Sequence, residues 1–236
     1  MQKIFSLIAV LGLVCSCNSS GPNILTAEEQ KDGWELLFDG KTTNGWHLYN
    51  MGNAPSVWEV KNGTLVCNPN GHKLEEHGDL VSDKEFENFD LKFEWQITEG
   101  GNSGVFINVL ERPDIMKAWG SGPEYQLLDN AHPDFPNPAK RSGCLFGFGP
   151  QKNPAANKPK GEWNESEIKQ ENGKISFYLN GVLTVEKDLT STAWLDSLAT
   201  SNFKTMPEYG KHTKGRIALQ EWKGGASFRN VKIRKL

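Results

Sequence analysis

The chain has 236 residues, with 26 Lys and Arg against 29 Asp and Glu, and a formal net charge of −3 at pH 7. This balance gives no general attraction to nucleic acid, which we exclude as an expected partner. Residues 31–236 suffice for one large domain with a well-buried core, and the pattern requires no second domain.

The first sixteen residues have the features of a secretory signal peptide. Lys3 is followed by an apolar run from Ile4 to Val14, which is too short to span a bilayer permanently. Val14-Cys15-Ser16-Cys17 resembles the lipobox of bacterial lipoproteins, which implies cleavage before Cys17 and a lipid on that residue. We expect residues 17–30 to form a lipid anchor and tether. The protein would then be exported and held to the bacterial envelope, touching the membrane only through this anchor; the alternative is an ordinary cleaved signal.

The first part of the domain reads as short strands joined by glycine turns. An edge strand is predicted within Trp34–Lys41, and a brief strand at Asp79–Ser82. Between them, Trp58–Val60 and Thr64–Cys67 predict a hairpin, because Asn62-Gly63 suits the left-handed dihedrals of a two-residue turn.

Two strands of the predicted core follow. Phe89–Ile97 alternates apolar and polar residues without a fault, which predicts a half-buried antiparallel strand. A one-residue slip would expose all of its core-facing side chains, which are Phe89, Leu91, Phe93, Trp95 and Ile97. Val105–Leu110 is a nearly continuous apolar run, typical of an inner strand buried on both faces.

The stretch Gly122–His132 concentrates the polar chemistry of the chain. The turn dipeptide Gly122-Pro123 precedes a short strand, in which Glu124 and Gln126 share one face. Asp129 has the opposite parity, and His132 follows just before a proline, so both would lie at the mouth of a loop. We predict a functional site here; the alternative is that Glu124 and Gln126 merely face solvent on one side of a sheet.

The remaining sequence predicts further strands and at most one helix. Cys144–Phe148 is predicted as a strand between Pro- and Asn-rich loops, residues 163–187 as a three-strand meander, and Trp194–Leu198 as weakly helical. Arg216–Trp222 and Ser227–Arg234 would be the closing strands. Phe228 is out of phase with the later apolar residues of its strand, which predicts a bulge there.

Many short strands without any alternation of strand and helix predict an all-β protein, an antiparallel sandwich. Cys67 and Cys144 could pair, since an exported location permits a disulfide without requiring it. Neither cysteine lies in a Cys-x-x-Cys spacing, which argues against a thiolate zinc site.

Several motifs together give the chain a family resemblance. It resembles the bacterial 3-keto-disaccharide hydrolase family, long known only as a domain of unknown function, from about Trp34 to Leu236. The resemblance implies a concanavalin A-like jelly-roll sandwich and the cleavage of sugars oxidised at C3, by hydrolysis or by elimination. The motifs are Leu37–Lys41, Asn44–Trp46, Asn102–Gly104, Glu124–Asp129, Gly161–Asn164, Leu179–Gly181, Leu219-Gln220 and Phe228–Asn230.

The implied chemistry begins at C2 of the sugar. A ketone at C3 makes the C2 hydrogen acidic, so a general base can remove it while the group on C1 leaves. We assign Glu124 as the base or as a ligand, with Asp129, His132 and Glu221 as further catalytic candidates. Glu221 joins them because it shares a strand face with apolar residues, although it could lie at a solvated strand end.

A divalent cation could hold the developing enolate, with Glu124, Asp129 and His132 as its ligands. Oxygen-based sites leave no reliable spacing signature, so the sequence leaves this open. The substrate itself would be a small carbohydrate, and its oxidation would require a sugar 3-dehydrogenase acting upstream.

The candidates for substrate binding are amides, a hydroxyl and tryptophans. Asn102 and Ser103 could reach a sugar hydroxyl or simply form a turn. Asn108 stands where many family members carry Arg, and Trp222 where many carry His. Tryptophans in a sandwich could stack on a sugar or belong to the core. The full set is Asn102, Ser103, Asn108, Gln126, Trp119 and Trp222, with Trp46 as a further stacking candidate.

The sequence also offers two alternatives to this assignment. Glu165 and Glu167 alternate on one strand as a glycosidase acid pair would, but Lys169 and Glu171 continue that face, which favours a solvated surface. The rival function is a non-catalytic, lectin-like carbohydrate-binding module, because sandwich folds host both classes.

Overall fold

The computed structural model describes residues 21–222 and 224–236. The predicted signal peptide at residues 1–16 and the predicted lipid site at Cys17 lie outside the described residues. Within them, no helix has the length and apolar character that crossing a membrane requires.

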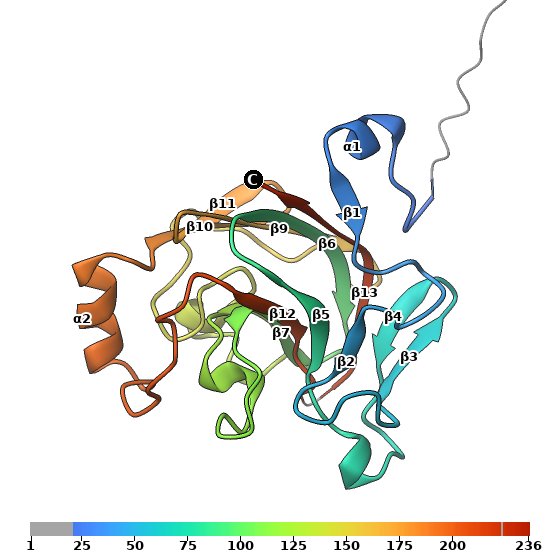
Figure 1. The fold of residues 1–236 in the computed structure, drawn as a ribbon, viewed down its shortest axis with the longest axis horizontal. Coiled ribbons are helices and arrows are strands. Elements are labelled where there is room, and N and C mark those ends of the chain that lie inside the picture. The colour runs from blue at the N-terminus through green and yellow to red at the C-terminus, as the bar shows by residue number, and fades with distance from the viewer. Residues whose placement is uncertain (1–20, 223) are drawn as a thin grey trace, which may run out of the picture.

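The described residues form two antiparallel sheets, which confirms the predicted all-β sandwich (Figure 1). The larger sheet has eight strands and curves around the smaller one, which has five. The larger sheet runs in the order β11 (Val182–Asp188), β10 (Lys174–Leu179), β9 (Asn164–Glu171), β6 (Phe89–Ile97), β13 (Ala226–Lys235), β4 (Thr64–Cys67) and β3 (Trp58–Lys61), with β1 (Trp34–Leu36) also paired to β13. The smaller sheet runs in the order β2 (Trp46–Leu48), β5 (Leu80–Phe86), β12 (Gly215–Leu219), β7 (Asn102–Val109) and β8 (Glu124–Leu128).

Helical segments are short in this part of the chain. They are α1 (Ala27–Lys31), α2 (Thr192–Thr200) and the 3-10 turns η1 (Leu74–Glu76), η2 (Ala118–Gly120) and η3 (Pro138–Lys140). The helix α2 includes the predicted helical stretch, and its Ser191 cap accepts the backbone N–H of Trp194.

The core between the sheets follows the predicted alternation of β6. Phe89, Leu91, Phe93 and Trp95 are buried, while Ile97 is only half-buried near the end of the strand. Phe93 meets Tyr125 of the opposite sheet edge to face, with ring centroids 5.7 Å apart. The departure from the pattern is Asp90, which is predicted to face solvent and is buried.

The turn predictions are confirmed by the backbone dihedrals. Asn62, Asn172 and Asn180 have φ values of 52°, 50° and 49°, which places the hairpin and both turns of the β9–β10–β11 meander in the left-handed region. The predicted bulge in β13 lies between Arg229 and Lys232, where the register with β6 shifts.

The prediction of a strand at Cys144–Phe148 is wrong. Only Leu145 forms an isolated bridge, to Tyr125, and the neighbouring residues are turns. The segment 142–146 nevertheless covers the outer edge of β8: the Gln126 N–H donates to the Cys144 carbonyl (3.1 Å) and the Phe146 N–H donates to the Glu124 carbonyl (3.1 Å). Cys67 and Cys144 are buried free thiols, so the two do not pair.

The segment before β1, predicted as part of a tether, is docked on the larger sheet from residue 23 onward. The Asn23 amide donates to the Gly63 carbonyl (2.8 Å), and the Asn230 N–H donates to the Asn23 side-chain oxygen (2.8 Å). Glu29 in α1 forms an ion pair with Lys232 of β13. Residues 23–31 therefore belong to the folded domain.

The outer face of the smaller sheet, which points away from the larger sheet, is only partly covered. A second apolar cluster packs there beneath the loop that contains η2, and its members are Tyr49, Val81, Phe106, Val109, Ile115, Ala118 and Ala218. Beside this cluster, the same face carries polar side chains. This arrangement leaves an open polar area on the outer face of β5, β12, β7 and β8.

Candidate functional site

A cavity of about 450 Å³ opens on the outer face of the smaller sheet. Tyr125 and Leu127 of β8 are buried in the core, so the alternation of the strand turns Glu124 and Gln126 outward into this cavity. Four aromatic side chains and several amides complete its wall. The lining residues are Asn102, Trp119, Glu124, Gln126, His132, Asp134, Phe146, Phe203, Gln220 and Trp222.

Glu124 lies over a glycine of the neighbouring strand. Gly104 of β7 pairs with Gln126, and a Cβ placed on Gly104 would lie 2.2 Å from Glu124 Oε1. The absence of a side chain at Gly104 therefore makes the room that the Glu124 carboxyl occupies. Glu124 is 6% exposed and its Oε1 has no hydrogen-bond partner, so the site holds a carboxyl oxygen that a ligand could satisfy.

Burial raises the pKa of Glu124 well above its usual range, and the negative charge of Asp79 raises it further. A carboxylate in such a place is a stronger base than one in water, because protonation relieves an unfavourable buried charge. The hydroxyl of Tyr209 is also buried without a partner; burial raises the pKa of this phenol well above its usual range, and the charge of Glu124 adds to the rise. Glu124 therefore has the environment of a proton-transfer group.

A second cavity of about 470 Å³ adjoins the first. Trp119, Gln220 and Trp222 line both cavities and form the boundary between them. Trp119 and Trp222 are 36% and 48% exposed, which is unusual for large apolar side chains. The residues found only in the second cavity are Pro69, Asn70, His77, Gly78, Asp79, Lys117, Glu221 and Gly224.

Asp79, which the sequence analysis did not select, is the buried acid of this second cavity. It directly precedes β5, and its Oδ1 accepts the backbone N–H of Glu221 (3.0 Å). Burial raises the pKa of Asp79 to about 7, and the charge of Glu221 adds to the rise, whereas Lys117 opposes it. Asp79 is two residues from Val81, so the alternation of an extended strand turns both side chains to the outer face. This spacing is the sequence feature that could have identified Asp79.

Of the predicted catalytic residues, Glu124 and His132 share the first cavity, and Glu221 lies in the second. The strand β12 ends at Leu219, earlier than predicted, so Glu221 leaves the sheet and its Oε1 lies 3.3 Å from His77 Nδ1. Asp129 is not brought to either cavity. Its Oδ1 accepts the backbone N–H groups of Gly100 (2.8 Å) and Ala131 (2.9 Å), which makes it a loop-forming residue.

The predicted binding residues divide in the same way. Asn102, Gln126, Trp119 and Trp222 line the first cavity. Ser103 is buried and donates to the Gln220 carbonyl (2.9 Å), so it positions the wall without facing the cavity.

Two other binding candidates lie away from both cavities. Asn108 is buried farther along β7, where its amide donates to the Gln170 side chain (2.6 Å). Trp46 is 4% exposed and belongs to the core, and its indole N–H donates to the Leu37 carbonyl (2.5 Å).

The predicted cation ligands do not assemble. The Asp129 carboxylate accepts the backbone N–H of Gly100, and the described residues contain no group of three or more His, Cys, Asp or Glu side chains placed to hold a metal ion. The cavity thus contains Glu124 and His132 of the predicted ligand set but not Asp129.

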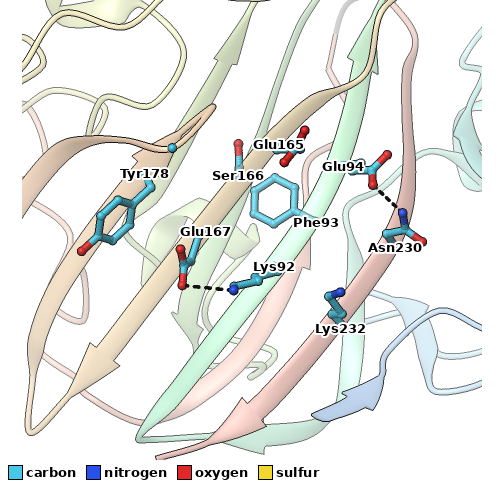
Figure 2. Close-up of a pocket in the computed structure, with 10 residues that line it drawn as sticks. Lys92, Phe93, Glu94, Glu165, Ser166, Glu167, Tyr178, Asn230 and Lys232 are labelled. Carbon is cyan, nitrogen blue, oxygen red and sulfur yellow. Dashed lines mark hydrogen bonds and ion pairs between the residues drawn. The ribbon is translucent and has the colours of Figure 1, made fainter. Parts of the chain in front are cut away.

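A smaller hollow lies on the outer face of the larger sheet, away from these cavities (Figure 2). Glu167 of β9 faces Lys92 of β6 across the strands (3.7 Å) and also lies 2.9 Å from Lys169. Glu165 is paired with Lys158 (2.8 Å). Both acids are matched by lysines on a solvated sheet face, in agreement with the interpretation favoured from the sequence.

The raised pKa of Asp79 leads to a pH-dependent stability. In the unfolded chain the pKa of an aspartate is about 3.9, whereas in the fold the pKa of Asp79 is about 7. Between these values the folded state binds more protons, so the free energy of unfolding falls as the pH rises and the loss is complete above about pH 7. Asp79→Asn keeps the shape of the side chain and removes this titration.

Urea unfolding at pH 5 and pH 8 measures the effect. Each unit between the two pKa values contributes about 1.4 kcal/mol, so we expect the wild type to lose on the order of 2 kcal/mol more than Asp79→Asn over this interval. The charge of Asp79 also raises the pKa of Glu124, so the difference between the two proteins includes the change that Asp79→Asn makes in the titration of Glu124. Equal losses in both proteins would contradict the burial penalty assigned to Asp79.

Comparison with known proteins places the chain in a family. Residues 33–234 match the family model described as a 3-keto-alpha-glucoside-1,2-lyase-like domain. A curated 3-keto-disaccharide hydrolase of Bacteroides thetaiotaomicron is 32% identical over 231 residues, covering 87% of this chain and 79% of that protein.

Solved structures agree with this match. The crystal structure of a candidate glycosyl hydrolase from Parabacteroides distasonis has a TM-score of 0.83 and 30% identity, covering 92% of this chain and 100% of that chain. A Bacillus subtilis protein with a galectin-like fold has a TM-score of 0.51 and 14% identity, covering 91% and 94%, and it supports the jelly-roll fold alone. The chain therefore belongs to the 3-keto-disaccharide hydrolase family, in which the matched domain is 3-keto-alpha-glucoside-1,2-lyase-like.

Proposed function

We propose that this protein cleaves glycosides whose sugar is oxidised at C3, beginning with removal of the C2 proton by Glu124. The observation that carries the proposal is the buried, unpartnered Glu124 carboxyl in a cavity with aromatic and amide walls. The family and the curated relative named a 3-keto-disaccharide hydrolase support the same substrate class.

The position of Glu124 suits abstraction of a carbon-bound proton. Such a proton is only weakly acidic even beside a ketone, so the base must be strong, and burial raises the pKa of Glu124. The Oε1 of Glu124 is buried against Gly104 while the residue lines the cavity, so the C2 hydrogen would approach the carboxyl from the cavity side. The cavity thereby supplies the one proton acceptor that the first step needs.

We assign His132 the role of stabilising charge on the sugar oxygens. Its Nδ1 accepts the backbone N–H of Asp134 (3.0 Å), so in the neutral imidazole the proton is on Nε2. His132 lines the cavity, where this N–H is a donor for the enolate oxygen or for a hydroxyl. Gln220 Oε1 is buried without a partner there and is an acceptor for a sugar hydroxyl.

The aromatic walls fit a sugar ring. Trp119, Trp222, Phe146 and Phe203 present apolar surface to the cavity, and the flat C–H face of a pyranose packs well on such surfaces. The amides of Asn102 and Gln126 are joined by a hydrogen bond of 2.7 Å, which fixes their orientation beside Glu124. Binding and proton transfer are thus combined in one cavity.

Loss of the C1 substituent after proton abstraction gives an unsaturated 3-keto sugar, and addition of water then completes a net hydrolysis. Because this chemistry needs the C3 ketone, the substrate must come from a reaction that oxidises the sugar at C3. A sugar 3-dehydrogenase acting upstream is therefore part of the proposal.

The test compares matched 3-keto and unoxidised glucosides with the purified protein, with and without a chelator. We expect turnover of the keto substrate only, because an unoxidised sugar offers no acidic C2 hydrogen. Equal turnover of both substrates would refute the mechanism. Binding of both without turnover would instead establish the lectin-like alternative, for which the exposed Trp119 and Trp222 are the supporting observation.

A further inference from the structure

Asp79 is a second buried carboxyl on the same sheet face as Glu124, and the abstraction of the C2 proton leaves it unused. The register of the strands places it near Glu124. Leu80 pairs with Leu219, the Gln220 N–H donates to the Gly104 carbonyl (2.8 Å), and Gly104 pairs with Gln126. Asp79, Gln220 and Gly104 therefore follow one another across β5, β12 and β7, and the Glu124 carboxyl lies over Gly104.

The two carboxyls thus stand on either side of Gln220, which lines both cavities. Neighbouring strands are about 4.8 Å apart, and two such spacings separate Asp79 from Gly104. A ligand of two rings could span this separation and so reach both cavities at once. Glu124 faces only the first cavity and Asp79 only the second. A base in the first cavity can act on the sugar ring, while an acid in the second can act on the oxygen of the leaving group.

Resting on the proposed function, we infer that the second cavity holds the leaving group and that Asp79 donates a proton to the glycosidic oxygen. Trp119 and Trp222 at the boundary would contact both rings of the substrate, which points to a disaccharide or an aryl glycoside as the substrate class. His77 and Lys117 in the second cavity offer further polar contacts to a leaving sugar.

The step is balanced without an added reagent. The Glu124 carboxylate takes the C2 proton, and the electron pair of the C2–H bond becomes the enolate and then the C1–C2 double bond. The C1–O bond breaks, its electron pair goes to the glycosidic oxygen, and this oxygen takes the proton of Asp79. Glu124 ends protonated and Asp79 ionised, and one proton passed back between them through solvent restores the enzyme.

The surroundings of Asp79 favour a protonated carboxyl before the reaction. Burial raises its pKa to about 7, the charge of Glu221 acts in the same direction, and Lys117 and the backbone N–H of Glu221 oppose it. Two nearby carboxyls in a poorly solvated site hold a single proton most readily, and such a pair titrates as a unit. The proposed step starts from the state in which this proton is on Asp79 and Glu124 is ionised.

The experiment uses two 3-keto substrates that differ in their leaving group. The 4-nitrophenolate of a 3-keto-4-nitrophenyl glucoside leaves without protonation, whereas the sugar alkoxide of a 3-keto-disaccharide needs a proton donor. We expect Asp79→Asn to lower kcat for the disaccharide by about two to four orders of magnitude and for the nitrophenyl substrate by no more than a few-fold. Glu124→Gln should lower both equally.

The matched control is Asp83→Asn, the same change within β5, the strand that Asp79 directly precedes. Asp83 is 55% exposed and paired with His47 (2.6 Å), away from both cavities, so this variant should act as the wild type on both substrates. Equal losses on both substrates in Asp79→Asn, or none, would overturn the assignment of Asp79. If Glu124→Gln loses activity on the disaccharide but keeps it on the nitrophenyl substrate, Glu124 would be the proton donor. That result would also overturn the assignment of Asp79. If the wild type turns over neither keto substrate, the proposed function itself fails.

Discussion

Replacing Glu124 by Gln should lower turnover of a 3-keto glycoside by about two to four orders of magnitude, the usual cost of removing a general base. The substitution keeps the volume of the side chain and the fit over Gly104 but cannot accept a proton from carbon. Because Glu124 is buried, the neutral amide should also be tolerated by the fold. Steady-state kinetics on one 3-keto substrate measure the effect.

The same variant separates binding from chemistry. Its substrate affinity, measured by calorimetry, should change much less than its turnover, because the aromatic and amide walls of the cavity are intact. The thermal midpoint of unfolding should be equal to that of the wild type or higher, since a buried carboxyl with a raised pKa is removed. Full activity of the variant would show that Glu124 is not the base.

Replacing Gly104 by Ala should inactivate the enzyme although Gly104 itself offers no functional group. The added methyl would lie 2.2 Å from Oε1 and 2.8 Å from Cδ of Glu124, so the carboxyl must leave its place. A displacement of about 1 Å in a catalytic group can cost roughly a hundredfold in rate. We therefore expect kcat to fall about a hundredfold, with an overpacking cost on the order of 1–3 kcal/mol in stability.

A double-mutant cycle distinguishes this effect from general damage. If Gly104→Ala acts by displacing Glu124, it should cost little further activity in the Glu124→Gln background, where the base is already absent. Additive losses in the double variant would mean that Gly104→Ala disturbs the cavity by another route. Circular dichroism of each variant checks that the sheets are retained.

Local patterns predicted the strands and the face of Glu124. The alternation in β6 identified four buried side chains, and Glu124 and Gln126 of β8 share the outward face that their spacing indicated. Asn-Gly turns located the hairpin and the meander, because left-handed dihedrals are a local property of these residues. Each of these features is decided within about ten residues of sequence.

The partners of Glu124 could not be obtained in this way. Asp79 is forty-five positions away in the chain and comes near Glu124 only through the order β5–β12–β7–β8, which no local period encodes. Asp129 was misjudged because its carboxylate is used by the loop that it begins, and Asn108 because it binds Gln170 of the other sheet. Sheet order and long-range polar contacts are the information that the single sequence lacks.

The segment 142–146, which covers the edge of β8, affects how this protein would inactivate and aggregate on heating. As the outermost strand of its sheet, β8 would otherwise present free backbone groups to other chains, and its side chains are buried throughout. The segment 142–146 occupies those groups, and Phe146 in it also lines the first cavity. Detachment of this one loop would expose an aggregation-prone edge strand and would also open the cavity. Heat inactivation and aggregation are thus coupled. After heating, a sample at high protein concentration would lose activity irreversibly, whereas a dilute sample would recover it on cooling.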